Sequence, residues 1–340
     1  MKPFRNGPGF VLLMIAMTVI TAMAAIASLC IGIYHVPVTQ VFRILFSGVL
    51  DLDETWTDNM YNVVMNSRLP RTIAAIAVGF ALAVAGACYQ GIFQNPLVSP
   101  DILGVTSGAT VGAATAIVLG VGYVTQMSMA FAGGIVAVAL CILLPALMRK
   151  RTTLALVLSG IIVGGFLSSV LGFIKYIATP ETELVEITFW QMGSLGKVSV
   201  DSLMIAIPVI AICCIVLIFM GWRINAMSLS DRDARSLGVD VVKERSLVII
   251  LATVITAISV CITGTIGWIG LTMPHFARLL VGDDSSKVIP LAGLISAAFL
   301  VIVDILARNL TGAEIPLSII TGFLGAPLFA ALLILNRSVE

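Results

Sequence analysis

Long runs of apolar residues, separated by short polar or glycine- and proline-rich breaks, occupy most of the chain. A run of about 20 residues is long enough to cross the hydrocarbon core of a bilayer, about 30 Å thick, as a helix. The pattern therefore predicts an all-α, polytopic membrane protein with about ten transmembrane helices. We expect these spans at residues 10–34, 69–90, 102–120, 124–148, 153–178, 200–222, 247–266, 269–281, 288–307 and 315–335.

Three of these runs are less clearly defined than the others. The runs at 102–120 and 269–281 are short and poorly bounded. Residues 10–34 carry no charge and follow Lys2 and Arg5, so a signal peptide is the competing interpretation. Their length favours a spanning helix. We treat residues 1–340 as a single transmembrane domain.

Composition supports a membrane protein and excludes other classes. Hydrophobic residues make up 59% of the chain, charged residues 11%, and mean hydropathy is +1.10, which is too apolar for a soluble globule. The net charge is +1 and basic residues are scattered at the ends of apolar runs, which argues against a nucleic-acid partner. The six cysteines lie inside apolar runs without metal-ligand spacing, so we expect no metal site.

The distribution of Lys and Arg predicts the orientation. If ten spans alternate, most basic residues outside them fall on one side, which marks that side as cytoplasmic. Both termini and the charged segment 227–245 then lie in the cytoplasm. The acidic stretches at 51–58 and 182–186 lie on the opposite side.

The segment 227–245 is the longest strongly charged stretch between two apolar blocks. Ser228 and Ser230 are candidate N-caps, and Gly238 is a suitable residue just past a helix end, so we expect a short, exposed helix. Two interpretations remain open from the residues alone. The segment is either an ordinary loop or a docking element for a soluble partner.

A weak internal repeat relates the two halves. Gly86, Pro96 and Gly104 have the same spacing as a second set 178 residues further on, which comprises Gly264, Pro274 and Gly282. The first set would run inward and the second outward, so the halves would be inverted repeats, as in many transporters.

Three arginines stand at predicted outer ends of spans, where Lys and Arg are disfavoured. Arg68 and Arg71 are three positions apart, which places them on one face of a helix, and Arg308 ends a later span. Contact with lipid headgroups is one explanation, and an external partner that carries carboxylates is the other. Asp304 lies four residues before Arg308, so we expect these two side chains to form a structural pair.

No nucleotide-binding or catalytic motif is recognisable. The stretch Gly193-Ser-Leu-Gly-Lys197 resembles the end of a phosphate loop, but Gln191 replaces the required first glycine and no strand precedes it. His275 is a lone histidine in an apolar run, and a buried, hydrogen-bonded imidazole is a simpler interpretation than a haem ligand or proton relay. We therefore expect no enzyme activity in this chain, and any energy from ATP must enter through another subunit.

Ordered motifs along nearly the whole chain resemble the FecCD-type permeases of bacterial ABC importers. The motifs are Arg68-Leu-Pro-Arg71, Gly86-Ala-Cys-Tyr-Gln90, Asn95-Pro-Leu97, Pro100-Asp-Ile-Leu-Gly104, Trp190-Gln-Met-Gly-Ser-Leu195, Ala234-Arg-Ser-Leu-Gly-Val239, Gly264-Thr-Ile-Gly267, Pro274-His275, Asp304 with Arg308, and Glu314-Ile-Pro316 through Gly325-Ala-Pro327. Members of this family import ferric siderophores, haem and vitamin B12.

The resemblance implies an architecture and a set of partners. The fold would be that of a type II ABC importer permease, assembled as a homodimer with two cytoplasmic ATPase subunits and one external binding protein. ATP and Mg would be used by the ATPases, and this chain would bind no cofactor. The location would be the inner membrane of the cell.

The resemblance also implies roles for individual residues. Arg68, Arg71 and Arg308 would dock the binding protein, and Thr152 and Thr153 would lie at a cytoplasmic gate. The ATPase-coupling residues would be Ser228, Leu229, Ser230, Asp231, Asp233, Ala234, Arg235, Leu237 and Gly238. Ser230 departs from the family, in which many members have glycine.

The function expected from these observations is import of an iron chelate, most simply a ferric siderophore, by alternating access. Haem, a corrinoid and a molybdate-like oxyanion remain alternatives. A secondary transporter driven by an ion gradient is the main competing class, since inverted repeats also occur there. A membrane receptor or scaffold would explain the hydrophobicity but not the charged segment.

Overall fold

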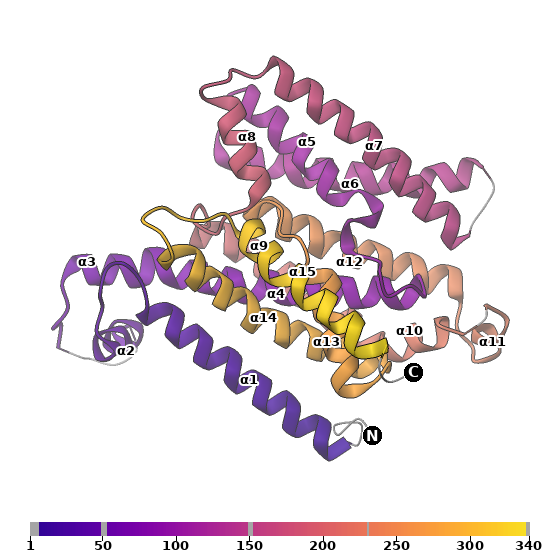
Figure 1. Ribbon diagram of the computed structural model, residues 1–340, viewed down its shortest axis with the longest axis horizontal. Helices are drawn as coiled ribbons and strands as arrows, with labels where there is room; N and C mark the ends of the chain where they lie inside the picture. The colour runs from indigo at the N-terminus through magenta and orange to yellow at the C-terminus, as the bar shows by residue number, and fades with distance from the viewer. Residues whose placement is uncertain (1–6, 49–52, 149–151, 230, 338–340) are drawn as a thin grey trace.

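The computed structural model describes residues 7–48, 53–148, 152–229 and 231–337, and all regular structure within these ranges is helical (Figure 1). Seven helices in these ranges are long and apolar enough to cross a membrane. They are α1 (Gly7–Cys30), α4 (Leu69–Ile92), α6 (Tyr123–Leu147), α7 (Thr153–Ile177), α9 (Val200–Phe219), α12 (Val241–Thr263) and α14 (Ser285–Asn309).

Three further apolar helices complete the set, namely α5 (Val105–Val118), α13 (Ile269–Val281) and α15 (Leu317–Arg337). Each of the ten predicted ranges overlaps one of these ten helices. The two short predicted runs correspond to α5 and α13, which have 14 and 13 residues. At about 1.5 Å per residue each rises only about 20 Å, so neither crosses a full hydrocarbon core by itself.

Several short helices lie between the long ones and were not predicted, apart from the one in the charged segment. They are α2 (Val38–Phe46), α3 (Asp58–Tyr61), the π-helix η1 (Asn62–Arg68), the 3₁₀ turn η2 (Pro100–Leu103), α8 (Glu183–Met192), α10 (Gly221–Met227) and α11 (Asp231–Ser236). Their apolar runs are too short, or too interrupted by charge, to stand out against the spans.

The first turn of α1, the last turn of α15 and α11 lie at one end of the bundle, and α2, α3 and α8 lie at the other (Figure 1). We name these the α11 end and the α8 end. This arrangement matches the predicted topology, in which the termini share a side with the charged segment.

Helix α4 forms the centre of the bundle and is buried over most of its length. Small residues allow its neighbours to approach closely, as is common between membrane helices. A side chain at Gly86 would place its Cβ 1.9 Å from the carbonyl oxygen of Gly270 in α13, and one at Gly79 would meet Ser296 of α14 at 2.7 Å. Ser296 also donates a hydrogen bond to the Gly79 carbonyl.

The internal repeat is visible in helix order but not in the residues that suggested it. The lengths of α4, α5, α6 and α7 are 24, 14, 25 and 25 residues, and those of α12, α13, α14 and α15 are 23, 13, 25 and 21. Gly86 lies inside α4, however, whereas Gly264 ends α12, so the pairing of glycines at an offset of 178 residues is wrong. The equivalent positions are Gly104 and Trp268, which precede α5 and α13 with φ of 73° and 71°.

Candidate functional site

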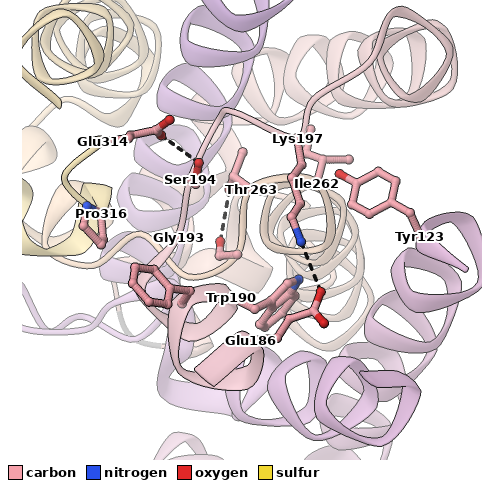
Figure 2. A pocket seen from close by; sticks show the side chains of 12 residues that line it. Tyr123, Glu186, Trp190, Gly193, Ser194, Lys197, Ile262, Thr263, Glu314 and Pro316 are labelled. Carbon is pink, nitrogen blue, oxygen red and sulfur yellow. Dashed lines mark hydrogen bonds and ion pairs between the residues drawn. The ribbon is translucent and has the colours of Figure 1, made fainter. Parts of the chain in front are cut away.

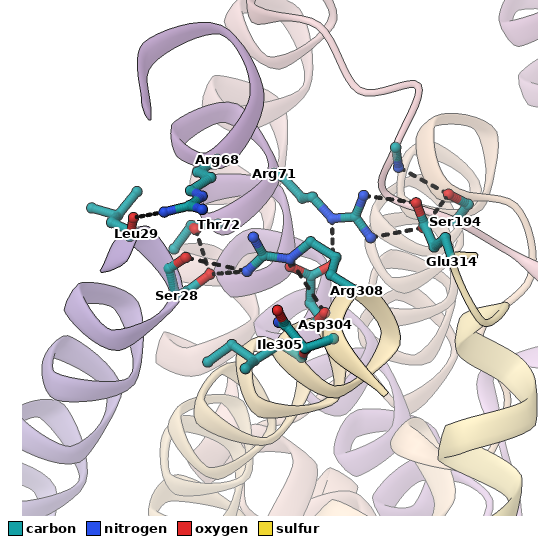
Figure 3. A network of polar contacts seen from close by, with 12 residues as sticks. Ser28, Leu29, Arg68, Arg71, Thr72, Ser194, Asp304, Ile305, Arg308 and Glu314 are labelled. Carbon is teal, nitrogen blue, oxygen red and sulfur yellow. Dashed lines mark hydrogen bonds and ion pairs between the residues drawn. The ribbon is translucent and has the colours of Figure 1, made fainter. Parts of the chain in front are cut away.

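Arg71, in the first turn of α4, is the centre of a charged network at the α8 end (Figure 3). Its Nε lies 2.6 Å from Oδ1 of Asp304, near the end of α14. Its two terminal nitrogens donate to the two carboxylate oxygens of Glu314, at 2.9 and 2.7 Å. This fork geometry is the strongest pairing that an arginine makes with a carboxylate. Arg71 therefore joins α4, α14 and the loop that leads into α15.

Asp304 and Arg308 form the predicted structural pair. The Arg308 Nε lies 3.0 Å from Asp304 Oδ2, and Asp304 is completely buried. Arg308 Nη2 also donates to the hydroxyl of Ser28 at 2.8 Å, and that hydroxyl bonds Thr72 at the same distance. The network thus extends to α1, and a fully buried carboxylate is balanced by two guanidinium groups.

Arg68 does not share a face with Arg71. The π-helix η1 ends at Arg68, and the two side chains point away from each other (Figure 3). Arg68 donates to the carbonyl oxygens of Leu29 and Cys30 at the end of α1, at 2.8 and 3.1 Å, and to that of Tyr34. The expectation of one common arginine face is therefore wrong for the guanidinium groups, because Arg68 binds carbonyl groups at the end of α1 whereas Arg71 binds carboxylates of α14 and of the loop before α15.

The three arginines are satisfied within the chain. Arg68 is 3% exposed and Arg71 is 7% exposed, so neither presents a free guanidinium group. Their occurrence at span ends thus has an internal reason, and contact with an external carboxylate is not needed to explain it. Docking of a partner by Arg68, Arg71 and Arg308 stays a prediction. Only Arg71 and Arg308 pair with the two carboxylates, whereas Arg68 binds carbonyl groups, so these five side chains together carry one excess positive charge.

Glu314 is the partner that the sequence did not reveal. It lies in the loop before α15, where it binds Arg71 and accepts a hydrogen bond from the Ser194 hydroxyl at 2.7 Å. Burial by itself raises the pKa of the Glu314 carboxyl, but the hydrogen bonds and charge of Arg71 outweigh this and lower the pKa below its usual value. Glu314 is therefore an anion at neutral pH.

A cavity of about 340 Å³ lies beside this network (Figure 2). Glu314 and Ser194 form one side, and Trp190 of α8 and Tyr123 of α6 form others. Ser194 is also tied to α12, because its amide donates to the carbonyl of Thr263 at 2.8 Å. The remaining lining residues are Glu186, Phe189, Gly193, Lys197, Ile262, Gly264 and Pro316. The cavity is largely apolar with a charged rim, and three separate loops determine its shape.

The charged segment at the opposite end is anchored to the bundle. Gln94, in the loop after α4, donates to the carbonyl of Met227 at 3.0 Å. Asn225 of α10 donates to Asp284 at 2.8 Å and accepts from the amide of Ser285 at 2.7 Å. These contacts hold the α10–α11 segment against α4 and the first turn of α14.

The short helix predicted in the charged segment is present as α11, and Gly238 follows it with φ of 80°, a left-handed conformation that favours glycine, while a role in ATPase coupling stays a prediction. Ala234 is fully buried, whereas Leu229 and Leu237 are 47% and 52% exposed. Ser228 is not an N-cap, because its hydroxyl donates to the carbonyl of Ile224 and so completes α10. Ser230 lies outside the described residues.

The remaining predicted residues have local roles. Thr152 caps α7 by accepting a hydrogen bond from the amide of Ala155 at 3.2 Å, and Thr153 is the first residue of that helix. A role in gating stays a prediction for both. His275 is 8% exposed and its Nε2 lies 2.9 Å from the carbonyl of Pro96, as expected for a satisfied buried imidazole. Within the described ranges, no three His, Cys, Asp or Glu side chains are grouped as metal ligands.

In the described part of the chain, ten apolar helices, a charged helix at one end and a charged network at the other define a polytopic membrane transport protein. The chain belongs to the FecCD transport family, whose model matches residues 19–335. It is therefore a membrane-spanning permease of the ABC importer family.

Individual relatives agree with this assignment. The chain is 37% identical to the molybdate import system permease protein MolB of Haemophilus influenzae over 322 residues, which cover 94% of both chains. It is 39% identical over 277 residues to a Helicobacter pylori protein named "Probable iron chelatin transport system permease protein", covering 82% of this chain and 84% of the relative. A solved ABC transporter in an inward-facing conformation matches with a TM-score of 0.84 and 35% identity, over 94% of this chain and 98% of that one.

Proposed function

We propose that two copies of this chain form the membrane channel of an ATP-driven importer in the inner membrane, with both termini in the cytoplasm. Two cytoplasmic ATPase subunits would grip the α11 ends, and one external binding protein would deliver an iron chelate to the α8 ends. The permease itself would carry out no covalent chemistry. Its contribution would be to alternate between openings toward the two sides.

The observation that carries this proposal is the construction of the α10–α11 segment. Leu229 and Leu237 flank the short helix α11 and are exposed, and the preceding helix α10 is held to the bundle by Gln94 and Asn225. A docking element must be firmly anchored in order to transmit force, and must offer apolar area in order to bind. An ordinary loop needs neither property.

The α8 end supports docking of an acidic partner, although not through free arginines. A partner carboxylate could bind at the cavity of about 250 Å³ lined by Arg68, Arg308 and Glu314. It would then compete for Arg68 and Arg308 with the carbonyl oxygens and the Asp304 carboxylate that bind them in the single chain.

Helix α7 supports the pairing of two copies. It exposes Ile161, Ile162 and Phe166, each more than 60% accessible in the single chain. Apolar side chains at that depth in a membrane face lipid, the second copy or a passage between them. A passage for a bulky chelate requires such apolar walls with few fixed charges, because a tight ionic site would retain its cargo.

An iron chelate is the substrate that we propose, since the Helicobacter pylori relative is named for such transport. Molybdate is the second candidate, because similarity to the molybdate permease of Haemophilus influenzae covers 94% of both chains. Import driven by an ion gradient is a weaker alternative. Its candidate proton carriers, His275 and Asp304, are both buried and held by other groups.

Uptake into proteoliposomes tests the proposal. The permease is reconstituted with its ATPase and binding-protein subunits, and entry of ⁵⁵Fe-labelled ferric siderophore and of ⁹⁹Mo-labelled molybdate is measured with and without internal ATP. We expect ATP-dependent uptake of the iron chelate. Uptake of molybdate without uptake of the iron chelate would show that molybdate is the substrate. Uptake that persists without the ATPase subunits would refute the ATP-driven mechanism.

A further inference from the structure

A groove of about 510 Å³ lies between α6, α9 and α12, three of the spanning helices. Its walls are mostly apolar and include Met127 and Phe131 of α6, Ile205 and Val209 of α9, and Val254 of α12. Ile205 is 75% exposed, so the groove opens on the outside of the chain. An apolar groove on the surface of spanning helices faces the hydrocarbon of the bilayer.

The length of the groove corresponds to one leaflet. On α9 its lining begins at Ser199, next to the first residue of the helix, and reaches Val209. A helix rises about 1.5 Å per residue, so these ten positions span about 15 Å. The hydrocarbon core is about 30 Å thick, and half of it is therefore about 15 Å. The groove begins at the α8 end and stops near the middle of the bilayer, which is the reach of one acyl chain.

Polar groups lie mainly at the α8 end of the groove. Tyr123 supplies a hydroxyl group there and Asp201 a carboxylate in the first turn of α9, while the hydroxyls of Ser199 and Ser202 also line the groove but bond each other and the backbone as the cap of α9. In the described part of the chain Asp201 has no ion-pair partner, and Lys197 nearby in sequence is paired with Glu186 at 3.1 Å. This end therefore offers acceptors and one negative charge to a ligand that brings hydrogen-bond donors and positive charge.

We propose that this groove is a phospholipid site that holds one acyl chain of phosphatidylethanolamine, with the headgroup ammonium against Asp201 and the neighbouring hydroxyls. An anionic headgroup such as phosphatidylglycerol lacks the ammonium and is repelled by the carboxylate. Tyr123 and Ile262 line both this groove and the cavity beside the charged network. Figure 2 shows Tyr123 at the edge of that cavity. A bound lipid would thus support one wall of the cavity.

Native mass spectrometry of the purified protein, offered equal amounts of phosphatidylethanolamine and phosphatidylglycerol, tests the site. We expect the wild type to retain phosphatidylethanolamine with a preference of about two- to fivefold, the range for one ion pair at an aqueous boundary. Asp201→Asn should abolish the preference. Val209→Phe should reduce the number of retained lipids by one, because the added ring occupies the groove. Val216→Phe is the matched control, since Val216 lies on the same helix, is 36% exposed and does not line the groove.

Two results would overturn the proposal. Equal retention by the wild type, Val209→Phe and Val216→Phe would show that lipid does not bind in the groove. An unchanged headgroup preference in Asp201→Asn would show that the carboxylate does not select the lipid. The measurement on Asp201→Asn can be interpreted even if Val209→Phe fails to fold. Asparagine has nearly the shape of aspartate and Asp201 is exposed, so we expect Asp201→Asn to fold.

Discussion

Asp304 provides the strictest test of the charged network, because it is completely buried and lies between two guanidinium groups at 2.6 and 3.0 Å. Replacement by Asn keeps the shape and removes the charge. Arg71 would keep Glu314, but Arg308 would lose its only carboxylate within ion-pairing distance in the described chain. Breaking a buried pair costs about 3–5 kcal/mol. Because Asn still accepts one hydrogen bond, we expect Asp304→Asn to lower the free energy of unfolding by about 3 kcal/mol.

The measurement is unfolding in mixed micelles by titration with SDS, followed by tryptophan fluorescence. Lys197→Gln is the control, because Lys197 and Glu186 form an ion pair whose side chains are 64% and 46% exposed. An exposed pair contributes less than about 1 kcal/mol, so this variant should be nearly as stable as the wild type. A loss for Asp304→Asn no greater than that for Lys197→Gln would refute the argument that burial makes the network strong.

Further predictions address pH, coupling and packing. The lowered pKa of Glu314 means that its contribution to stability is fully present above the unfolded pKa, near 4.5, and is lost as pH falls through the lower folded value. The difference in thermal midpoint between the wild type and Glu314→Gln should therefore be constant from neutral pH to about pH 5 and shrink in more acidic buffer; a constant difference at every pH contradicts this. Leu237→Lys should reduce ATP hydrolysis by the reconstituted transporter without loss of stability, whereas Leu310→Lys, 59% exposed at the other end, should leave hydrolysis unchanged. Gly86→Ala should cost about 1–3 kcal/mol in the SDS titration because its Cβ would meet the Gly270 carbonyl, but Gly172→Ala, which meets nothing within 4 Å, should cost nothing.

The spanning helices were predictable because the bilayer imposes a simple rule on composition and length. A chain that crosses hydrocarbon must pair its backbone internally and present apolar side chains, so every span leaves a readable run. Even the short runs that became α5 and α13 were found in this way. Helices α2 and α8 give no long apolar run in the sequence, because they are short and do not have to cross the membrane.

The charged network could be predicted only in part. Asp304 and Arg308 are four residues apart, and helix geometry alone pairs them. Arg71 and Glu314 are 243 positions apart, and only the fold brings them together. Arg68 and Arg71 are only three positions apart, yet one binds carbonyl groups at the end of α1 and the other binds carboxylates, and no local residue pattern announced this difference. One signal was available in the sequence. Glu314, two residues before Pro316, and Arg71, at the end of a span, are opposite charges that the predicted topology places at the same end of the bundle.

The loops 193–197 and 310–316 cannot be treated as independent parts. Ser194 bonds Glu314, the amide of Leu317 donates to the carbonyl of Gly193 at 3.0 Å, and Glu314 in turn holds Arg71 of α4. In a chimera with a related permease, exchange of one loop alone would leave Arg71 or Ser194 without its partner. Exchange of both loops together would transfer a complete set of contacts, so the unit of exchange at this end is two segments more than a hundred residues apart in sequence.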